Sequence, residues 1–156
     1  IIEILGEYPR LSYFEKIKRN IKINSNREIR VIIALSGFYG IPKLFMKYFL
    51  ENMIELLLSH KIKVVFRPHP QNLLDDEAIK IKQKFLKHKL FIFDNSENYF
   101  KQYLSSTLLI TDYSGTAYTY AMITLNPVIF FSYNKKYINI LKYNKLNYFK
   151  DEKNLI

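Results

Sequence analysis

Five short, mostly apolar runs alternate with longer amphipathic segments along this chain. Each run holds four or five residues, and the five are Val31–Leu35, Ile62–Phe66, Leu90–Phe93, Leu108–Thr111 and Val128–Phe131. Runs of this length that are rich in Val, Ile and Phe are typical of buried strands. Strands that alternate with helices favour a parallel sheet covered by helices on both faces. The sequence therefore predicts an α/β fold, a Rossmann-like three-layer α/β/α arrangement around a mostly parallel sheet.

The segments between these runs carry helix signals. Pro42 suits the first turn of a helix. Apolar residues follow it at helical spacing, at Phe45, Phe49, Met53, Leu56 and Leu57. Such a stripe predicts the face that packs against the sheet. A later and shorter helix is expected to be capped by Asn95 or Ser96.

Length and composition indicate about one domain of a larger protein. Residues 27–156 are expected to form the Rossmann-like domain, and residues 1–26 an interdomain linker and the start of that domain. The chain has 156 residues and does not begin with Met, so we expect a fragment. It holds no Cys, and no apolar stretch approaches the roughly 20 residues of a transmembrane helix. We therefore expect a cytoplasmic protein without disulfides or thiolate metal sites.

The chain is strongly basic. Its formal net charge is +10, from 24 Lys and Arg against 14 Asp and Glu. Such a charge attracts phosphates, anionic membrane surfaces or nucleic acids. The lysines are scattered and form no block, which favours a compositional bias spread over solvated faces. Peripheral attraction to the inner face of the cell membrane stays open, whereas specific binding of nucleic acid is not expected.

Three polar loops are predicted to meet at one edge of the sheet. If the strand order is 3-2-1-4-5, the chain reverses direction between the first and fourth strands, and ligands bind beyond the carboxyl ends of strands at that point. The loops there are Ser36–Gly40 and Asp112–Thr116, and the loop Arg67–Pro70 lies beside them. The three loops therefore define one candidate crevice.

The loop after the fourth strand has the composition of a phosphate-binding turn. Ser114 can cap the following helix, Gly115 allows close approach of a ligand to the backbone, and the Thr116 hydroxyl adds a hydrogen-bond donor. Asp112 is an unusual neighbour for a phosphate, so we expect it to hold the loop or to meet a sugar hydroxyl or a metal. An ordinary capped helix start is the alternative interpretation.

The loop after the second strand places a histidine between two prolines. Pro68 and Pro70 restrict the backbone on either side of His69 and lower the entropy cost of aiming its side chain. Arg67 offers a planar fork for phosphate, and His69 could protonate a leaving phosphate or donate a hydrogen bond to it. A solvated or structural histidine is the alternative. The spacing of the three histidines shows no zinc motif, and no Walker loop is present.

Several of these motifs, in this order, resemble one known family. Gly6–Leu11 resembles the Gly-Tyr-Pro-Arg-Leu element of the CDP-glycerol glycerophosphotransferase family, with one residue inserted. Arg67–Pro70 is similar to its His-Pro motif, Thr111–Gly115 to its Thr-Asp-Tyr-Ser-Ser motif, and Pro127–Phe131 to the strand that follows. The resemblance covers nearly the whole chain.

The resemblance implies the C-terminal, donor-binding domain of a GT-B glycosyltransferase. His69 is then the catalytic residue that contacts the diphosphate of a nucleotide-activated donor, and Ser114, Gly115 and Thr116 cradle that diphosphate. A polysaccharide or lipid-linked acceptor and a further catalytic histidine would belong to an N-terminal GT-B half that is missing here. No cofactor or metal is expected. The full predicted nucleotide-diphosphate-binding set is Ser36, Gly37, Arg67, His69, Asp112, Ser114, Gly115, Thr116 and Thr119.

Two departures from the family pattern leave the substrate open. Gly115 replaces the second Ser, and Thr119 stands where the family usually has Asp or Glu. The expected function is therefore a transferase of cell-surface polysaccharide biosynthesis that moves either glycerophosphate or a sugar. A sugar-nucleotide epimerase of GT-B-like architecture and a basic membrane- or nucleic-acid-binding module are the alternatives.

Overall fold

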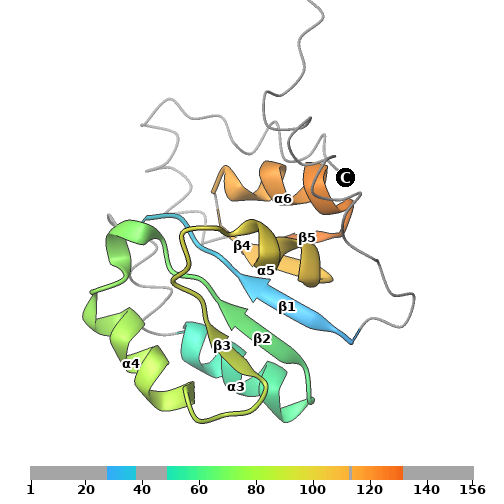
Figure 1. Cartoon of the computed structure of the whole chain (residues 1–156). Helices are drawn as coiled ribbons and strands as arrows, with labels where there is room; N and C mark the ends of the chain where they lie inside the picture. Colours follow the sequence, from blue (N-terminus) through green and yellow to red (C-terminus); the bar gives the residue numbers. More distant parts are fainter. Residues whose placement is uncertain (1–27, 38–48, 113, 132–156) are drawn as a thin grey trace, which may run out of the picture.

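A five-stranded parallel sheet organises the chain in the computed structural model, which describes residues 28–37, 49–112 and 114–131 (Figure 1). The strands are β1 (Arg30–Ile33), β2 (Lys63–Phe66), β3 (Phe91–Phe93), β4 (Leu108–Thr111) and β5 (Val128–Phe130). Their order is β3-β2-β1-β4-β5, and all four neighbouring pairs are parallel. The strand order on which the predicted crevice depends is therefore confirmed.

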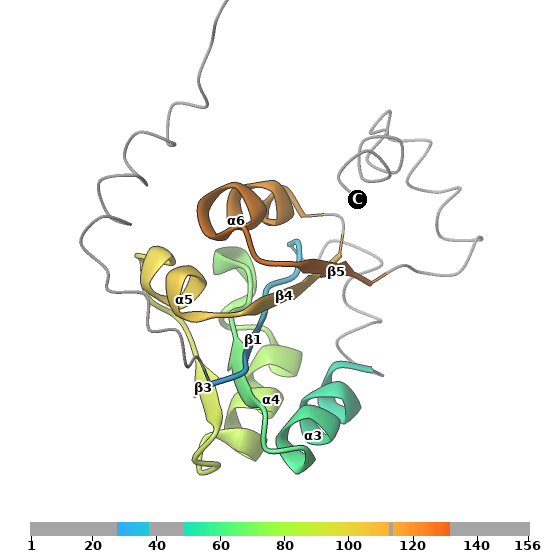
Figure 2. The same ribbon diagram turned by 90° about the vertical axis from the view of Figure 1, so that its right-hand side faces the viewer.

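Helices cover both faces of the sheet. The described helices are α3 (Glu51–Ser59), α4 (Asp76–Phe85), α5 (Phe100–Ser105) and α6 (Thr116–Thr124), with one 3-10 turn, η2 (Pro70–Asn72). In two perpendicular views, α3 and α4 lie on one side of the sheet and α5 and α6 on the other (Figures 1 and 2). The predicted three-layer α/β/α arrangement is confirmed for this part of the chain.

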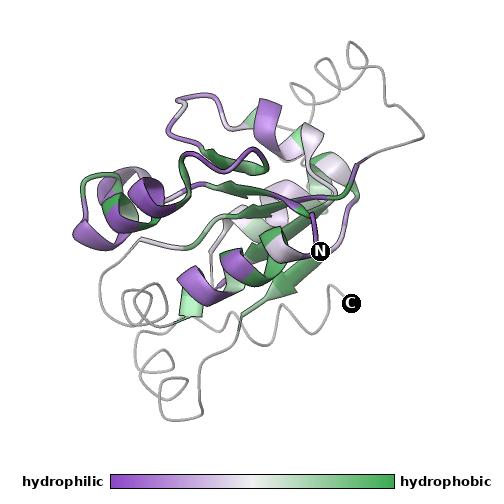
Figure 3. Ribbon diagram, turned by 90° about the horizontal axis from the view of Figure 1, so that it is seen from below, coloured by the Kyte–Doolittle hydropathy of each residue, from purple (hydrophilic) through white to green (hydrophobic). Residues whose placement is uncertain are grey.

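The core is divided by the alternation of side chains along the strands. Val31 and Ile33 point to the face under α3 and α4, where the buried cluster also includes Ile54, Leu58, Val64, Phe66, Ile81 and Phe85. Ile32 points to the opposite face, where the cluster includes Val65, Tyr103, Leu109, Tyr120 and Ile123. Figure 3 shows the strands as the most hydrophobic part of the ribbon. Each fully buried aliphatic side chain stabilises the fold by about 1.5–3 kcal/mol.

The carboxyl ends of the central strands are in register. Ile33, the last residue of β1, pairs with Phe66 at the end of β2 and with Ile110 near the end of β4. The Thr111 hydroxyl donates a hydrogen bond of 2.5 Å to the backbone oxygen of Ala34. The loops that follow β1, β2 and β4 therefore leave the sheet next to one another, at the carboxyl-terminal ends of the strands.

One local expectation is right only in part, and another is wrong. In α3 the predicted Met53 and Leu57 pack against the core, but the fully buried side chains are Ile54 and Leu58, and Leu56 is exposed. The segment has apolar residues on two adjacent stripes, so its periodicity alone does not decide which stripe faces the sheet. The start of α5 is satisfied by Asn98, whose side-chain oxygen accepts the backbone N–H of Phe100, and not by Asn95 or Ser96. Residues 1–26 and Pro42 lie outside the described residues.

Candidate functional site

The loops after β1 and β4 are joined by one residue from each. The backbone N–H of Ser36 donates to Oδ1 of Asp112 at 2.7 Å, and the Ser36 hydroxyl donates to Oδ2 at 2.6 Å. The two residues are 76 positions apart in the sequence. We refer to this pair of hydrogen bonds as the Ser36–Asp112 latch. It confirms that two of the three predicted loops meet.

Asp112 is a buried carboxyl group at this junction. Only 1% of the residue is exposed. Burial raises its pKa, because a charged carboxylate is poorly solvated there, and the hydrogen bonds from Ser36 oppose that rise. Within the part of the chain that the structure describes, it forms no ion pair. These contacts match one of the roles expected for Asp112, which was to hold the loop.

Ser36 and Gly37 have different relations to a ligand from those expected. Both hydrogen-bond donors of Ser36 are engaged by Asp112, so a ligand could meet only the lone pairs of its hydroxyl oxygen. Gly37 lies against the loop after β2. A Cβ atom at Gly37 would stand 3.3 Å from Nδ1 of His69 and 3.4 Å from Oε1 of Gln71. A larger residue at position 37 would push these side chains away, so glycine allows the close approach.

His69 is held in a defined orientation. It precedes the 3-10 turn η2, whose first residue is Pro70, and its Nδ1 accepts the backbone N–H of Gln71 at 3.3 Å. Because Nδ1 acts as an acceptor, the neutral ring carries its proton on Nε2. His69 therefore offers Nε2–H as a hydrogen-bond donor, which suits an anionic oxygen.

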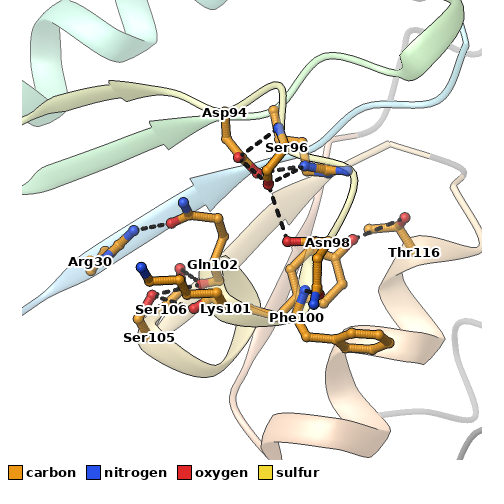
Figure 4. Close-up of polar contacts among 12 residues, drawn as sticks. Arg30, Asp94, Ser96, Asn98, Phe100, Lys101, Gln102, Ser105, Ser106 and Thr116 are labelled. Carbon is orange, nitrogen blue, oxygen red and sulfur yellow. Dashed lines mark hydrogen bonds and ion pairs between the residues drawn. The ribbon is translucent and has the colours of Figure 1, made fainter.

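Arg67 is partly committed to a partner within the protein. Its Nη1 forms an ion pair of 2.5 Å with Oδ2 of Asp94, and the two side chains are 12% and 3% exposed. The guanidinium also lies 5.8 Å from the centre of the Tyr99 ring. Asp94 in turn accepts the N–H and the hydroxyl of Ser96 through Oδ1, at 3.2 and 2.6 Å (Figure 4). Asp94 is absent from the predicted set, although a carboxylate directly after a buried strand is a signal that it shares with Asp112.

The start of α6 presents two hydroxyl groups whose hydrogens are available. The N-cap residue of α6 is Gly115 and not Ser114 as predicted, but Ser114 Oγ accepts the N–H of Thr116 at 3.3 Å and so satisfies one of the free N–H groups at the helix start. The Thr116 hydroxyl accepts a hydrogen bond of 3.3 Å from Tyr103 (Figure 4). Burial raises the pKa of Tyr103, so its hydroxyl keeps the proton that it donates. Among the described residues neither hydroxyl donates a hydrogen bond, so in this part of the chain Ser114 and Thr116 each keep a hydrogen that a ligand could accept.

Gly115 and Thr119 complete the predicted set. A Cβ atom at Gly115 would meet nothing within 4 Å, so here glycine leaves open space, in contrast to Gly37. Thr119 lies in the first turn of α6, three residues after Thr116 and on the same side of the helix, and its N–H donates to the Gly115 oxygen. Within the described residues, no group of three or more His, Cys, Asp or Glu side chains could hold a metal ion.

Comparison with known proteins assigns the family. A family model described as CDP-Glycerol:Poly(glycerophosphate) glycerophosphotransferase matches residues 37–152. The chain belongs to this family. Within the glycerophosphotransferase family model lie the loops with His69 and with Asp112 to Thr116, together with four of the five described strands.

One relative of this family member and one solved structure similar to it are much longer than the chain. The minor teichoic acid biosynthesis protein GgaB of Bacillus subtilis (strain 168) is 32% identical over 105 residues, which make up 63% of this chain and 11% of GgaB. The solved structure of the wall teichoic acid polymerase TagF is 22% identical, with a TM-score of 0.48, over 88% of this chain and 32% of TagF. The chain therefore spans only a small part of each relative.

Proposed function

We propose that this chain is the donor-binding part of a transferase of cell-surface polysaccharide biosynthesis. The enzyme would move glycerophosphate from a nucleotide-diphosphate donor such as CDP-glycerol to a polysaccharide or lipid-linked acceptor. The proposal rests on the convergence of three loops at one edge of the sheet, with hydrogen-bond donors on His69, Ser114 and Thr116. Membership of the glycerophosphotransferase family supports it.

The proposed chemistry is positioning of the nucleotide donor and stabilisation of the leaving nucleotide phosphate. Negative charge grows on that phosphate as its bond to the transferred group breaks. Nε2–H of His69 and the hydroxyls of Ser114 and Thr116 are preorganised hydrogen-bond donors for it. The start of α6 adds the positive end of a helix dipole. In this mechanism the protein's own groups meet the charge without a metal, so EDTA should leave binding of the nucleotide donor unchanged.

Isothermal titration calorimetry with CDP-glycerol tests the proposal. We expect His69→Ala and Ser114→Ala each to weaken binding about tenfold, the equivalent of about 1.4 kcal/mol. His88→Ala is a matched control, because His88 Nδ1 accepts the N–H of Leu90 at 3.2 Å in the same way, but in the turn before β3 at the opposite edge of the sheet. The control should bind like the wild type. Failure of the wild type to bind CDP-glycerol or any nucleotide-sugar would refute the proposal.

The same titration decides what is transferred. Gly115 and Thr119 depart from the pattern that the family resemblance implies, so a nucleotide-sugar is the competing donor. Binding of CDP-glycerol in preference to nucleotide-sugars supports glycerophosphate transfer. The reverse preference would make the protein a glycosyltransferase of the same architecture.

The proposed enzyme needs a second domain. We infer a GT-B arrangement in which an N-terminal half carries the acceptor site and a further catalytic histidine. The chain alone is then expected to bind the nucleotide donor without transferring its group, and the full-length gene product to do both. Transfer by the isolated chain would contradict this arrangement.

We place the protein in the cytoplasm, at the inner face of the membrane. None of the described helices is long and apolar enough to cross a membrane. Lys61, Lys87 and Lys89 are exposed in the turns before β2 and β3, at the edge of the sheet opposite the site. Binding to anionic vesicles that weakens with added salt is the expected result in a sedimentation assay, and equal recovery with neutral vesicles would argue against it.

A further inference from the structure

The Ser36–Asp112 latch reaches the predicted catalytic residue through one intervening glycine. Asp112 holds Ser36 by both its N–H and its hydroxyl. The next residue, Gly37, lies so close to the imidazole that an added Cβ would stand 3.3 Å from Nδ1 and 3.5 Å from Cε1 of His69. The loop after β1 therefore lies next to the ring, with less space between them than a methyl group needs.

Among the described residues, the hydrogen bond that the ring accepts is longer than either bond of the latch. Nδ1 of His69 accepts the Gln71 N–H at 3.3 Å, which is long for a hydrogen bond of this type. The two bonds of the latch are shorter, at 2.7 and 2.6 Å, and they hold Ser36 to one carboxyl group at two points. If Gly37 moved away, the ring would lose this close neighbour, and the long bond to Gln71 would be left to fix which nitrogen faces it.

We propose that Asp112 is a positioning residue for His69: through Ser36 it holds Gly37 against the imidazole, which keeps Nδ1 on the Gln71 N–H and the ring proton on Nε2. The role of Nε2–H as a hydrogen-bond donor to the nucleotide diphosphate rests on the function proposed above. The orientation of the ring does not, and it can be measured without any ligand.

The two variants of Asp112 separate geometry from charge. Asp112→Ala removes both acceptors of the latch. Asp112→Asn removes the charge but keeps the shape, since its amide oxygen can accept the Ser36 N–H while its amide nitrogen donates to the Ser36 hydroxyl. Ser36→Ala removes one bond and keeps the other, and it serves as the second variant if Asp112→Ala does not fold. Ser36→Thr keeps the hydroxyl and is the conservative rescue.

Thr111→Val is the matched structural control. It removes the buried hydrogen bond from Thr111 to the Ala34 oxygen, which joins the same two strand ends one step below the latch. A general loosening of the junction would appear in this variant as well, whereas a specific effect on His69 would not.

The measurement is the tautomer of His69, from nitrogen chemical shifts of the ¹⁵N-labelled chain at alkaline pH, where imidazoles are neutral. The signals of the three histidines are assigned with single substitutions of each. We expect a single Nε2–H tautomer in the wild type, Asp112→Asn, Ser36→Thr and Thr111→Val. A mixture of tautomers is expected in Asp112→Ala and Ser36→Ala.

Three results would overturn the proposal: one unchanged tautomer in both Asp112→Ala and Ser36→Ala, a mixture in Asp112→Asn equal to that in Asp112→Ala, or the same mixture in Thr111→Val. A second arm measures CDP-glycerol affinity, which should fall about fivefold in Ser36→Ala and recover in Ser36→Thr. A wild type that shows the expected tautomers but binds no nucleotide would refute the proposed function and leave the positioning role of Asp112 intact.

Discussion

Two buried carboxyl groups lie at the carboxyl-terminal edge of the sheet, and they differ in the partners that stabilise them. Asp94 follows β3 and Asp112 follows β4, and each accepts the N–H and the hydroxyl of one serine. At Asp94 the serine is two residues away and Arg67 supplies a cation. At Asp112 the serine is 76 residues away and no cation pairs with it among the described residues.

The difference separates a local support from a long-range tether. At Asp94, the hydrogen bonds from Ser96 fix the loop that holds both residues, and Arg67 neutralises the carboxylate. The main contribution of these contacts is therefore to stability. The latch uses a buried carboxyl group that has no cationic partner among the described residues to hold two distant loops together. A buried charge without a cation is costly, which is the kind of cost that functional sites tolerate. The predictions that follow test this contrast, from the largest expected effect to the smallest.

Removing the cation should have the largest effect on stability. Arg67→Met leaves Asp94 buried without its ion-pair partner, and we expect the free energy of unfolding to fall by about 3–5 kcal/mol. Urea denaturation measures this change. Arg67→Lys retains a cation without the planar fork and should lose less. An equal loss in both variants would mean that the geometry of the fork, and not the charge, stabilises this centre.

Removing the serine hydroxyl of the latch should have the next largest effect. Ser36→Ala leaves one buried carboxyl oxygen of Asp112 without its partner, which should lower the free energy of unfolding by about 1–3 kcal/mol. Thermal denaturation of this variant beside Ser36→Thr checks the prediction. A smaller loss of unfolding free energy in Ser36→Ala than in Ser96→Ala would contradict the predicted order.

The pH dependence of stability should reveal the buried carboxyl group of Asp112. Burial raises the pKa of Asp112 above its ordinary value of 3.8. The folded state therefore binds this proton more tightly than the unfolded chain, and the resulting stability is full below 3.8 and is lost as the pH rises through the raised value. Asp112→Asn does not titrate, so its stability relative to the wild type should increase as the pH rises through that window. Denaturant titrations at a series of pH values measure the difference in unfolding free energy between the two proteins. A difference that does not change with pH would contradict this prediction.

The smallest effect is expected at Ser96. Ser96→Ala removes one of the bonds to Asp94, but Arg67 and the Ser96 backbone N–H remain. Ser96 is exposed, so water can replace its hydroxyl, and the loss should stay below about 1 kcal/mol. The same denaturation assay applies. A loss of unfolding free energy as large as that of Ser36→Ala would show that the two serine hydroxyls contribute equally to stability.

The sequence allowed the sheet and the meeting of its loops to be predicted, because both depend on patterns that are local or general. Apolar runs locate strands, and the preferred order of such sheets brings the loops of Ser36 and Asp112 to one edge. The partner of Arg67 could not be predicted, because Asp94 reaches it only through the pairing of β2 with β3. The packed face of α3 was predicted only in part: Met53 and Leu57 do pack against the core, but the buried Ile54 and Leu58 were missed, since adjacent apolar stripes look alike without the sheet beside them.

The latch also has a consequence for the order of events during synthesis. Domains fold as the chain emerges from the ribosome, and contacts between distant residues form late. The acceptor for Ser36 does not exist until Asp112 has been made, and the two meet only when β4 docks beside β1. A nascent or cleaved chain that ends before Leu108 holds His69 but lacks the tether that we propose positions it. On the function proposed above, a nascent chain would acquire its full affinity for the nucleotide only after Asp112 has been made and β4 has docked beside β1.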